Sequence, residues 1–483
     1  MTLDPTLNCL PQRLRSVHLM GVGGVAMGAL AGALADRGLD VRGSDGPLYP
    51  PMSTFLAAKG VPVAQGYDPA NLDPPPDLVV VGNVIRRDNP EAMELARRGL
   101  CYLSLPQALA ELFIADKTAI VIAGTHGKTT TTALTASGLL HAGAAPGFLV
   151  GGVMIEGGRN FADGRGAHFV VEGDEYDTAF FDKRPKFVHY RPKIGVLTSV
   201  EFDHADIYAD LDAVRVAFDQ FAALIPPEGV LIAWGDDPEV LARAQKARCP
   251  VQTYGQGPQC LWRLLAARPS PQGGALIELQ PPGGPAVEFY SPLAGRHNAL
   301  NACAAVAAMT AGGVALAEAC RVQGLFQGVR RRQEVRDRAG GVTVVDDFAH
   351  HPTAVRETIA AVADFGLPGW RPGDGRLIAV FEPRTNTSKT NHFQAEYATA
   401  FDRADLVLLR EPPGAEAIEA SRRFSSTRLA QDLAERGLQA RALANGDGLL
   451  AELLAELRPG DLCLIMSNGA FEGLHARLLA ALA

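Results

Sequence analysis

A short loop around residues 124–129 carries glycine, lysine and hydroxyl side chains directly after an apolar run. Gly124 and Gly127 allow the backbone to bend close to a polyphosphate, because glycine has no side chain to obstruct the approach. Lys128 supplies a positive charge for the outer phosphates, and the Thr129 hydroxyl is placed to bind magnesium. These residue types and their spacing predict a phosphate-binding loop.

The elements that must position this loop favour the same interpretation. Residues 118–123 are β-branched or apolar, as in a buried parallel strand, and residues 129–141 are numerous enough for a helix. The loop would then lie at a helix amino terminus, where free N–H groups and the helix dipole attract anions. The common pattern G-x-x-x-x-G-K-[ST] places glycine where this chain has Ile122, and an ordinary helix start is the alternative.

Two acidic segments follow apolar runs that predict further strands, at residues 169–171 and 194–198. The first segment contains Glu172, Asp174, Glu175 and Asp177, and the second contains Glu201, Asp203, His204 and Asp206. Because open α/β sheets bind ligands at the carboxyl ends of their strands, we expect both segments beside the phosphate loop. Carboxylates and one histidine suit a hard divalent cation that bridges phosphate oxygens. The alternative is a pair of solvated acidic loops.

The amino-terminal region begins like a nucleotide-binding βαβ unit. A short apolar strand from Ser16 leads into Gly21, Gly23 and Gly24, and Asp45 follows about 20 residues later, where a ribose-binding acid is expected. The spacing is G-x-G-G rather than G-x-G-x-x-G, so a tight turn without a ligand is the alternative. Further strands are predicted at residues 61–66 and 77–82, and a helix at residues 90–98.

The last third of the chain repeats the strand-then-polar pattern. Strands are predicted at residues 342–345, 376–381, 405–409 and 461–466. Polar clusters follow three of them, at residues 346–352, 382–389 and 467–471, and we expect all three clusters along one edge of the sheet. Residues 256–292, rich in Pro, Gly and Gln, predict peripheral hairpins and loops. Near residue 296 a helix starts at which Asn298 could contact an adenine edge or act as a cap without any ligand.

The chain therefore predicts an α/β protein of three domains. These are a Rossmann-like domain at residues 1–110, a central P-loop ATPase-type domain at 111–329 and a second Rossmann-like domain at 330–483. The net charge of −8 and the pI near 5.8 give no reason to expect a nucleic-acid partner. The seven scattered cysteines fit a reducing compartment, and no apolar run reaches the roughly 18 residues of a membrane span. We expect a cytoplasmic protein without a membrane partner; the sequence does not indicate its oligomeric state.

Six motifs in this order resemble the Mur ligase family: GTHGKTTT at 124–131, EGDEYD at 172–177, EFDHADIY at 201–208, GRHNALN at 295–301, RRRQE at 330–334 and DDFAHHPT at 346–353. The resemblance covers nearly the whole chain. It implies an ATP-dependent, amide-bond-forming ligase of bacterial cell-wall precursor synthesis, with ATP and Mg²⁺ as cofactors.

Longer strings resemble one particular member of that family. They are YPPMST at 49–54, EYDTAFFDKRPKFVHY at 175–190 and EPRTNT at 382–387. That member joins L-alanyl-γ-D-glutamyl-meso-diaminopimelate to UDP-N-acetylmuramate through an acyl phosphate in peptidoglycan recycling. The alternative within the family is UDP-N-acetylmuramate:L-alanine ligase of de novo peptidoglycan synthesis. Outside it, a nucleotide-dependent dehydrogenase would leave the phosphate loop unused, and a non-catalytic UDP-sugar sensor would not need intact lysine and metal positions.

The resemblance also implies roles for individual residues. The catalytic residues would be Lys128, Glu172, His204 and Arg332, and the magnesium ligands Thr129, Glu172 and His204. ATP would contact Gly124, Thr125, His126, Gly127, Lys128, Thr129, Thr130, His297, Asn298 and Asp347. The UDP-sugar would contact Gly21, Gly23, Gly24, Ser44 and Asp45. The peptide would contact His350, Arg384, Asn386, Ser467 and Asn468.

Two departures from the family pattern limit this transfer of roles. Ser199 stands where relatives carry asparagine, and residues 206–220 contain no lysine that could carry the carbamate used by several sister ligases. We therefore expect no such modification. The incoming amine must lose a proton, and the sequence offers His204 or His350 as its base.

Overall fold

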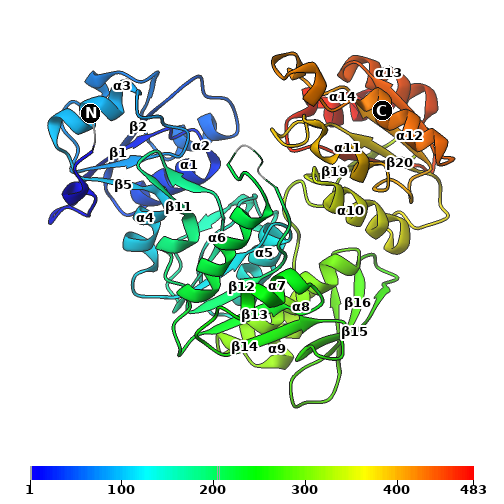
Figure 1. Cartoon of the computed structure of the whole chain (residues 1–483), viewed down its shortest axis with the longest axis horizontal. Helices are drawn as coiled ribbons and strands as arrows, with labels where there is room; N and C mark the ends of the chain where they lie inside the picture. Colours follow the sequence, from blue (N-terminus) through cyan, green and yellow to red (C-terminus); the bar gives the residue numbers. More distant parts are fainter. Residues whose placement is uncertain (1–2, 204, 206) are drawn as a thin grey trace.

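The structure of this protein is a computed structural model that describes residues 3–203, 205 and 207–483. Figure 1 shows three bodies in chain order, with the cyan-to-green central body joined to both the blue amino-terminal body and the yellow-to-red carboxy-terminal body. Their principal sheets have five, ten and six strands. The predicted α/β architecture with three domains is confirmed. No helix in the described part of the chain is both long and apolar enough to cross a membrane.

The amino-terminal sheet is parallel throughout, in the order β3-β2-β1-β4-β5. Its strands are β1 (Ser16–Met20), β2 (Asp40–Asp45), β3 (Val63–Gln65), β4 (Leu78–Val81) and β5 (Tyr102–Ser104). The helices are α1 (Val25–Asp36), α2 (Met52–Ala58), α3 (Pro90–Arg98) and α4 (Leu105–Leu109). The strands predicted at residues 61–66 and 77–82 and the helix predicted at 90–98 are therefore present.

The central sheet has the order β17-β16-β15-β14-β13-β12-β6-β9-β7-β8. Its parallel part consists of β6 (Thr118–Ala123), β7 (Gly147–Leu149), β9 (His168–Gly173), β12 (Ile194–Leu197), β13 (Val230–Trp234) and β14 (Val251–Gly255). At one edge, β15 (Trp262–Pro269), β16 (Ala275–Gln280) and β17 (Val287–Ser291) form the antiparallel hairpins predicted for residues 256–292. At the other edge lies β8 (Phe161–Ala162), and β10 (Asp177–Ala179) pairs separately with β11 (Asp182–Pro185).

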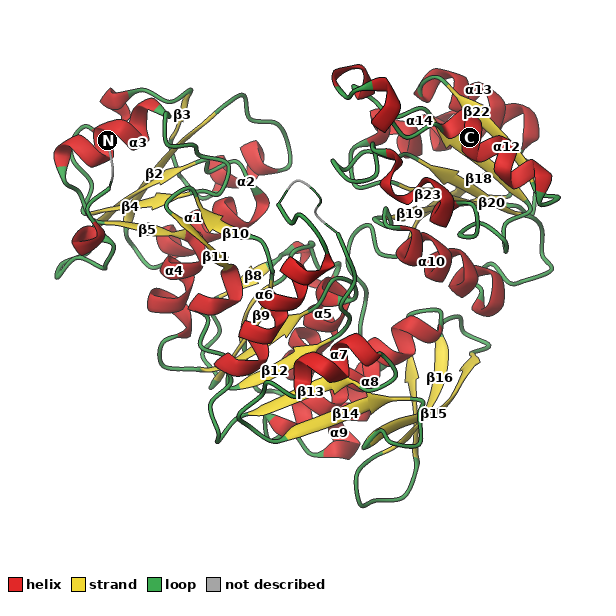
Figure 2. Ribbon diagram, viewed as in Figure 1, coloured by secondary structure: helices red, strands yellow, loops and turns green. Residues whose placement is uncertain are grey.

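Helices cover both faces of the central sheet, as Figure 2 shows. They are α5 (Lys128–His141), α6 (Leu211–Leu224), α7 (Pro238–Ala244), α8 (Arg296–Ala311) and α9 (Leu316–Gln323). Alternate residues of β6 point into two different apolar cores, with Val121 in one and Ile120 and Ile122 in the other. Burial on both faces explains why this strand has no polar alternation in sequence.

The carboxy-terminal sheet has the order β18-β19-β23-β20-β21-β22, with antiparallel β18 and otherwise parallel strands. Its strands are β18 (Glu334–Ala339), β19 (Val342–Asp347), β20 (Leu377–Phe381), β21 (Leu406–Arg410), β22 (Gln439–Leu443) and β23 (Leu462–Met466). The helices are α10 (Pro352–Phe365), α11 (Gln394–Tyr397), α12 (Ser426–Glu435), α13 (Gly446–Glu456) and α14 (Leu474–Leu482). Because β19, β23 and β20 are adjacent and parallel, the three predicted polar clusters begin at one edge.

The amino-terminal and central domains share a continuous apolar core. One cluster of buried apolar side chains includes Leu30 and Leu34 of α1 together with Phe113 and Phe169 of the central domain. Arg37 covers the Phe113 ring and forms a two-bond ion pair with Asp163, at 2.8 and 2.9 Å. The carboxy-terminal domain contacts the central domain through hydrogen bonds, such as that from Thr353 Oγ1 to Glu201 Oε2 at 2.7 Å, and through apolar packing that includes Ala294 and Phe202.

Candidate active site

The predicted phosphate loop joins β6 to α5 and lies at the carboxyl edge of the central sheet. Gly124 and Gly127 have φ values of +131° and +84°, which side-chain-bearing residues rarely adopt. A Cβ at Gly124 would lie 2.2 Å from Thr198 Oγ1, so the neighbouring strand end also requires glycine there. Gly127 is the N-cap of α5 and provides no side chain to its free N–H groups. The loop therefore presents backbone donors toward an anion site.

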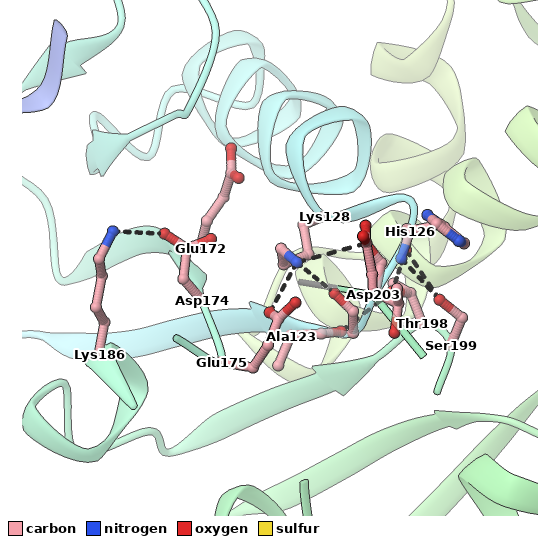
Figure 3. A network of polar contacts seen from close by, with 12 residues as sticks. Ala123, His126, Lys128, Glu172, Asp174, Glu175, Lys186, Thr198, Ser199 and Asp203 are labelled. Carbon is pink, nitrogen blue, oxygen red and sulfur yellow. Dashed lines mark hydrogen bonds and ion pairs between the residues drawn. The ribbon is translucent and has the colours of Figure 1, made fainter. Parts of the chain in front are cut away.

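Lys128 lies in this loop and is held by protein oxygens on two sides. Its Nζ donates to the Gly124 carbonyl at 2.6 Å and to Glu175 Oε2 at 2.9 Å, a contact drawn in Figure 3. Burial disfavours the ammonium, but the Glu175 and Asp174 carboxylates outweigh this effect and raise the pKa of Lys128. The lysine is thus a fixed positive charge at neutral pH.

Thr129 and Glu172 bring two hard oxygen donors together. Thr129 Oγ1 donates to Glu172 Oε2 at 3.1 Å, and Gly151 N–H donates to Glu172 Oε1 at 2.5 Å. Burial and the nearby Asp174 charge raise the pKa of Glu172. A divalent cation would offset the repulsion between these carboxylates, and oxygen donors are its preferred ligands. The donor set therefore fits Mg²⁺.

A small cavity connects this edge to the amino-terminal domain. Its volume is about 70 Å³, and its walls include Val25 of α1 together with Glu172, Asp174 and Lys186. Asp174 accepts a bond from Lys186 Nζ at 2.9 Å, as Figure 3 shows. The cavity places charged groups of the central domain next to the first turn of α1.

The second acidic segment supports the loop through backbone bonds. Thr125 Oγ1 donates to the Glu201 carbonyl at 3.0 Å and accepts from the Glu201 N–H at 2.9 Å. The Ser199 hydroxyl accepts the His126 N–H at 2.8 Å, so this departure from the family pattern has a structural role here. The predicted metal ligand His204, like Asp206, lies outside the described residues.

The start of α8 faces the loop helix α5. Thr131 of α5, adjacent to Thr130, donates to Asn301 Oδ1 at 3.3 Å, and Asn301 Nδ2 donates to Asn298 Oδ1 at 3.2 Å. Asn298 Nδ2 donates to the Ala294 carbonyl at 2.8 Å, while the N-cap itself is Gly295.

His297, another predicted ATP contact, has a buried and uncharged imidazole. Its Nδ1 is buried and has no hydrogen-bond partner among the described residues. Burial lowers the pKa of His297 to about 4, so the imidazole is neutral near pH 7. A neutral ring with an unpaired nitrogen is available to a ligand that carries hydrogen-bonding groups, such as an adenine.

The linker into the carboxy-terminal domain carries Arg332 to the phosphate loop. Its Nη2 donates to Thr129 Oγ1 at 3.3 Å. The flanking residues Arg331 and Gln333 have φ values of +62° and +49°, which are strained for side-chain-bearing residues. The buried Asp347 carboxylate accepts the Gln333 N–H at 2.8 Å and thereby fixes the linker to β19. Asp347, a predicted ATP contact, thus lies at the domain junction.

The predicted peptide contacts follow three neighbouring strand ends: His350 after β19, Arg384 and Asn386 after β20, and Ser467 and Asn468 after β23. The Ser467 hydroxyl donates to the buried Glu382 carboxylate at 2.6 Å and accepts the Gly469 N–H at 2.9 Å. Arg384 is 42% exposed and 3.7 Å from Glu382. These side chains form one polar edge, with Arg384 as its exposed cation.

His350 has a defined protonation pattern. Its Nδ1 lies 3.0 Å from the Phe348 carbonyl, which can only accept, so Nδ1 carries the proton. Burial lowers the pKa of His350, and its Nε2 is 3.9 Å from Asp203 of the central domain. The ring therefore directs an unprotonated nitrogen toward the domain interface.

The glycine turn of the amino-terminal domain is filled by its own aspartate. Gly21 has φ +78° and donates its N–H to the Ser44 carbonyl at 2.8 Å, and Gly24 is the N-cap of α1. Asp45 Oδ2 accepts the Gly23 N–H at 2.6 Å, and its Oδ1 accepts from Tyr67 at 3.2 Å. Asp45 thus occupies the anion-binding end of α1, where a sugar-nucleotide phosphate would compete with it.

The Ser44 side chain points away from this turn. It is fully buried and donates to Glu91 Oε2 at 2.6 Å. His18 Nε2 lies 3.1 Å from the same oxygen. The Ser44 hydroxyl therefore belongs to the domain core. Ser44 can affect a ligand only through its backbone and by positioning the neighbouring Asp45.

Sequence reasoning gave no role to several residues that the structure places at this site. They are Lys186, Thr198, Arg331, Thr353, Glu382 and Arg410. Five of them contact a residue of the predicted phosphate loop, acidic segments or peptide site, as Glu382 contacts Ser467 across 85 residues, and Arg410 acts indirectly by pairing with Glu382. Four of them, Lys186, Arg331, Thr353 and Glu382, lie within the motifs that resemble the family, but these motifs do not indicate which distant residues they contact.

A phosphate loop, acidic strand ends and a third domain over the same edge define a class of ATP-dependent ligases. Family comparison agrees along nearly the full chain. Residues 16–117 match the Mur ligase family catalytic domain, 122–309 the Mur ligase middle domain and 331–469 the Mur ligase glutamate ligase domain. The chain belongs to the Mur ligase family.

Two kinds of relative are similar at full or nearly full length. UDP-N-acetylmuramate–L-alanyl-γ-D-glutamyl-meso-2,6-diaminoheptandioate ligase of Escherichia coli K12 is 39% identical and covers 97% of this chain and 98% of its own. UDP-N-acetylmuramate–L-alanine ligase of Paenarthrobacter aurescens TC1 is also 39% identical but covers 82% of this chain and 83% of its own. The crystal structure of a murein peptide ligase from Psychrobacter arcticus 273-4 superposes with a TM-score of 0.70 at 34% identity, covering 97% and 98% of the two chains.

Proposed function

We propose that this protein is an ATP-dependent ligase that joins L-alanyl-γ-D-glutamyl-meso-diaminopimelate to UDP-N-acetylmuramate in peptidoglycan recycling. The observation that carries the proposal is the match to the E. coli ligase of this name, which extends over 97% of this chain. We further propose a cytoplasmic location, where ATP is available, and a mechanism through an acyl phosphate.

Lys128 and the first N–H groups of α5 would hold the outer phosphates of ATP. The positive charge of Lys128 is fixed by Glu175, and preorganised charge of this kind stabilises phosphoryl transfer without a protein nucleophile. Arg332 reaches Thr129 from the linker and would stabilise charge on the transferred phosphate. Thr129 and Glu172 would hold Mg²⁺, which supplies neutralising charge to the phosphates.

The amino-terminal domain would bind the UDP-sugar at its glycine turn. The cavity is lined by Val25 and Ala26, which directly follow that turn, and by Glu172 beside the phosphate loop, so the lactyl carboxylate would reach ATP through it. Displacement of Asp45 from the Gly23 N–H would free the turn for a phosphate. Binding at this turn would therefore be coupled to movement of Asp45.

The carboxy-terminal domain would supply the peptide site and the base. We assign the base to His350, because its Nδ1 proton is held by the Phe348 carbonyl and leaves Nε2 able to accept a proton. Arg384 is the exposed cation of the polar edge and would bind a peptide carboxylate. Closure over the central domain would exclude water from the acyl phosphate.

The test is phosphate release by the purified protein with ATP, Mg²⁺ and UDP-N-acetylmuramate, comparing the tripeptide with L-alanine. We expect release with the tripeptide and a UDP-muramoyl-tripeptide product by mass spectrometry. Release with L-alanine alone would support the second candidate, which the identity to the Paenarthrobacter enzyme favours. Release with neither amine would contradict both.

A further inference from the structure

Three side chains from two domains converge beside the phosphate loop. His126 belongs to the loop and Glu201 to the segment after β12, whereas His351 is the N-cap of α10 in the carboxy-terminal domain. Glu201 Oε2 lies 3.7 Å from His126 Nε2 and 3.8 Å from His351 Nδ1. One donor atom from each residue lies within 4.8 Å of the other two. The three residues are therefore close enough to share one ion.

The two imidazoles have nitrogens that the protein leaves unpaired. His126 Nε2 and His351 Nε2 are buried and have no hydrogen-bond partner among the described residues. His351 is only 6% exposed, and its ring centroid is 4.5 Å from that of His126. Burying His126 Nε2 without a hydrogen bond, 3.7 Å from Glu201 Oε2, is unfavourable, and a bound ion would relieve this cost.

Neighbouring contacts hold these side chains in place. Thr353 Oγ1 donates to Glu201 Oε2 at 2.7 Å, and the Thr353 N–H donates to His351 Nδ1 at 3.3 Å. The first bond fixes the carboxylate, as outer-shell hydrogen bonds do for metal ligands. The second bond requires His351 Nδ1 to be unprotonated, which is the state in which an imidazole nitrogen can bind an ion. The cluster is thus supported by one threonine that contacts both the carboxylate and an imidazole.

We propose that His126, Glu201 and His351 form a binding site for a divalent transition-metal ion of the zinc class, separate from the Mg²⁺ site at Thr129 and Glu172. Two imidazoles and one carboxylate are a donor set that favours Zn²⁺, Co²⁺ or Ni²⁺ over Mg²⁺, which prefers oxygen ligands. Three protein ligands leave a coordination position for water or a substrate oxygen. The inference stands on donor geometry and does not depend on the proposed substrates.

Occupation of this site would link two domains. His351 moves with the carboxy-terminal domain, while His126 and Glu201 belong to the central domain, so the ion would hold the two in their present arrangement. A ligase that must open and close in each cycle would be slowed by such a link. Zinc-class ions would then inhibit the ligase by opposing domain opening, and they would not compete with Mg²⁺ for its site.

Cobalt binding to the full-length, chelator-treated protein tests the proposal. Co²⁺ is titrated in the presence of excess Mg²⁺, and the visible d–d absorption of bound cobalt is recorded together with the thermal unfolding midpoint. We expect saturation at one cobalt per chain and a rise in the midpoint, because a ligand that binds the folded state stabilises it.

Two substitutions and a control make the result specific. His351→Asn removes the imidazole but keeps a residue that caps helices well, and Glu201→Gln keeps an acceptor for Thr353. Both should bind cobalt at least about tenfold more weakly and lose the midpoint rise, since outer-shell losses alone cost 10–100-fold. His392→Asn removes an exposed imidazole outside the cluster and should behave as the wild type.

Three results would overturn the site. The first is loss of the wild-type absorption in excess Mg²⁺, which would place cobalt at Thr129 and Glu172. The second is unchanged cobalt binding by His351→Asn, and the third is the absence of cobalt absorption in the wild type. None of these readouts requires ligase activity, so failure of this site and failure of the proposed reaction are distinguishable.

Discussion

Lys128 Nζ and Glu175 Oε2 lie 2.9 Å apart, with the lysine side chain 11% and the glutamate side chain 2% exposed. The pair fixes the cation of the phosphate loop before any phosphate arrives. A buried ion pair of this kind responds differently to loss of one partner and loss of both. This difference separates the structural contribution of the pair from the catalytic contribution of the lysine.

Lys128→Met should abolish most activity and destabilise the protein. Glu175 would be left buried without this cation, which costs about 3–5 kcal/mol in urea unfolding. Phosphate release should fall at least about 100-fold, because a preorganised charge is removed. The double variant Lys128→Met/Glu175→Gln should regain much of the stability but none of the activity. A double variant less stable than the single one would show that the two side chains are not coupled.

Glu172→Gln should raise the Mg²⁺ concentration needed for half-maximal phosphate release by about tenfold or more, because one charged oxygen ligand is lost. The amide can still accept the Gly151 N–H, so unfolding should change little. Glu156→Gln is the matched control, since Glu156 pairs with His141 away from the loop. An identical Mg²⁺ dependence in the Glu172 variant and the control would remove Glu172 from the metal site.

Arg332→Ala should lower kcat by about 10²–10³-fold, the usual loss when a group that stabilises transition-state charge is removed. The KM for ATP should change much less, because Lys128 and the loop backbone still bind the phosphates. Arg338→Ala, at a more distant position in β18, serves as the control. A large rise in KM at constant kcat would instead assign Arg332 to ground-state binding.

Gly124→Ala should be far more damaging than Gly143→Ala. Both positions have positive φ, so both variants carry backbone strain of about 1–3 kcal/mol. At Gly124 the new Cβ also meets Thr198 Oγ1 at 2.2 Å, whereas nothing lies within 4 Å of it at Gly143. Thermal unfolding and ATP binding measured on both proteins separate the clash from the strain. Equal effects at the two positions would contradict the close packing of the loop on the strand end.

Stability should decrease as the pH falls from about 7 toward 4. Burial lowers the pKa of His297 to about 4, below the 6.5 of the unfolded chain, so the unfolded state binds more protons between these values. Stability therefore rises with pH across this window. His297→Gln should weaken the pH dependence of the unfolding free energy by about 1–3 kcal/mol over the window. Substitution of the exposed His392 by Gln should leave the pH dependence of the unfolding free energy unchanged. If the curve for His297→Gln ran parallel to that of the wild type, it would contradict the buried, neutral state of His297.

Local patterns were sufficient to predict the frame of this site. The apolar run of β6 and the Gly-Lys-Thr that follows it specify a strand, a turn and a helix through interactions among near neighbours. The acidic residues after β9 and β12 meet the loop because parallel strands place their carboxyl ends at one edge. These features depend on periodicity and strand direction, both of which are visible in sequence.

Pairings between distant residues could not be predicted in this way. Arg332 meets Thr129 across 203 positions, and Thr353 meets Glu201 across 152. Such contacts depend on how whole domains pack, which no local spacing encodes. Two strands were not predicted for a different, local reason. β18 contains Arg336, Asp337 and Arg338 among its six residues, and β22 has alanine at two of its five positions, a residue with low strand propensity.

Arg331 and Gln333 have left-handed backbone torsions, so the linker between the central and carboxy-terminal domains is strained on both sides of Arg332. Backbone torsions of this kind persist only where the surrounding structure holds them, and the Asp347 carboxylate holds the Gln333 N–H at 2.8 Å. Arg332 lies between the two strained residues and reaches Thr129 with its guanidinium. Because the linker that carries Arg332 also begins the carboxy-terminal domain, a rotation of that domain would move one positive charge at the phosphate loop.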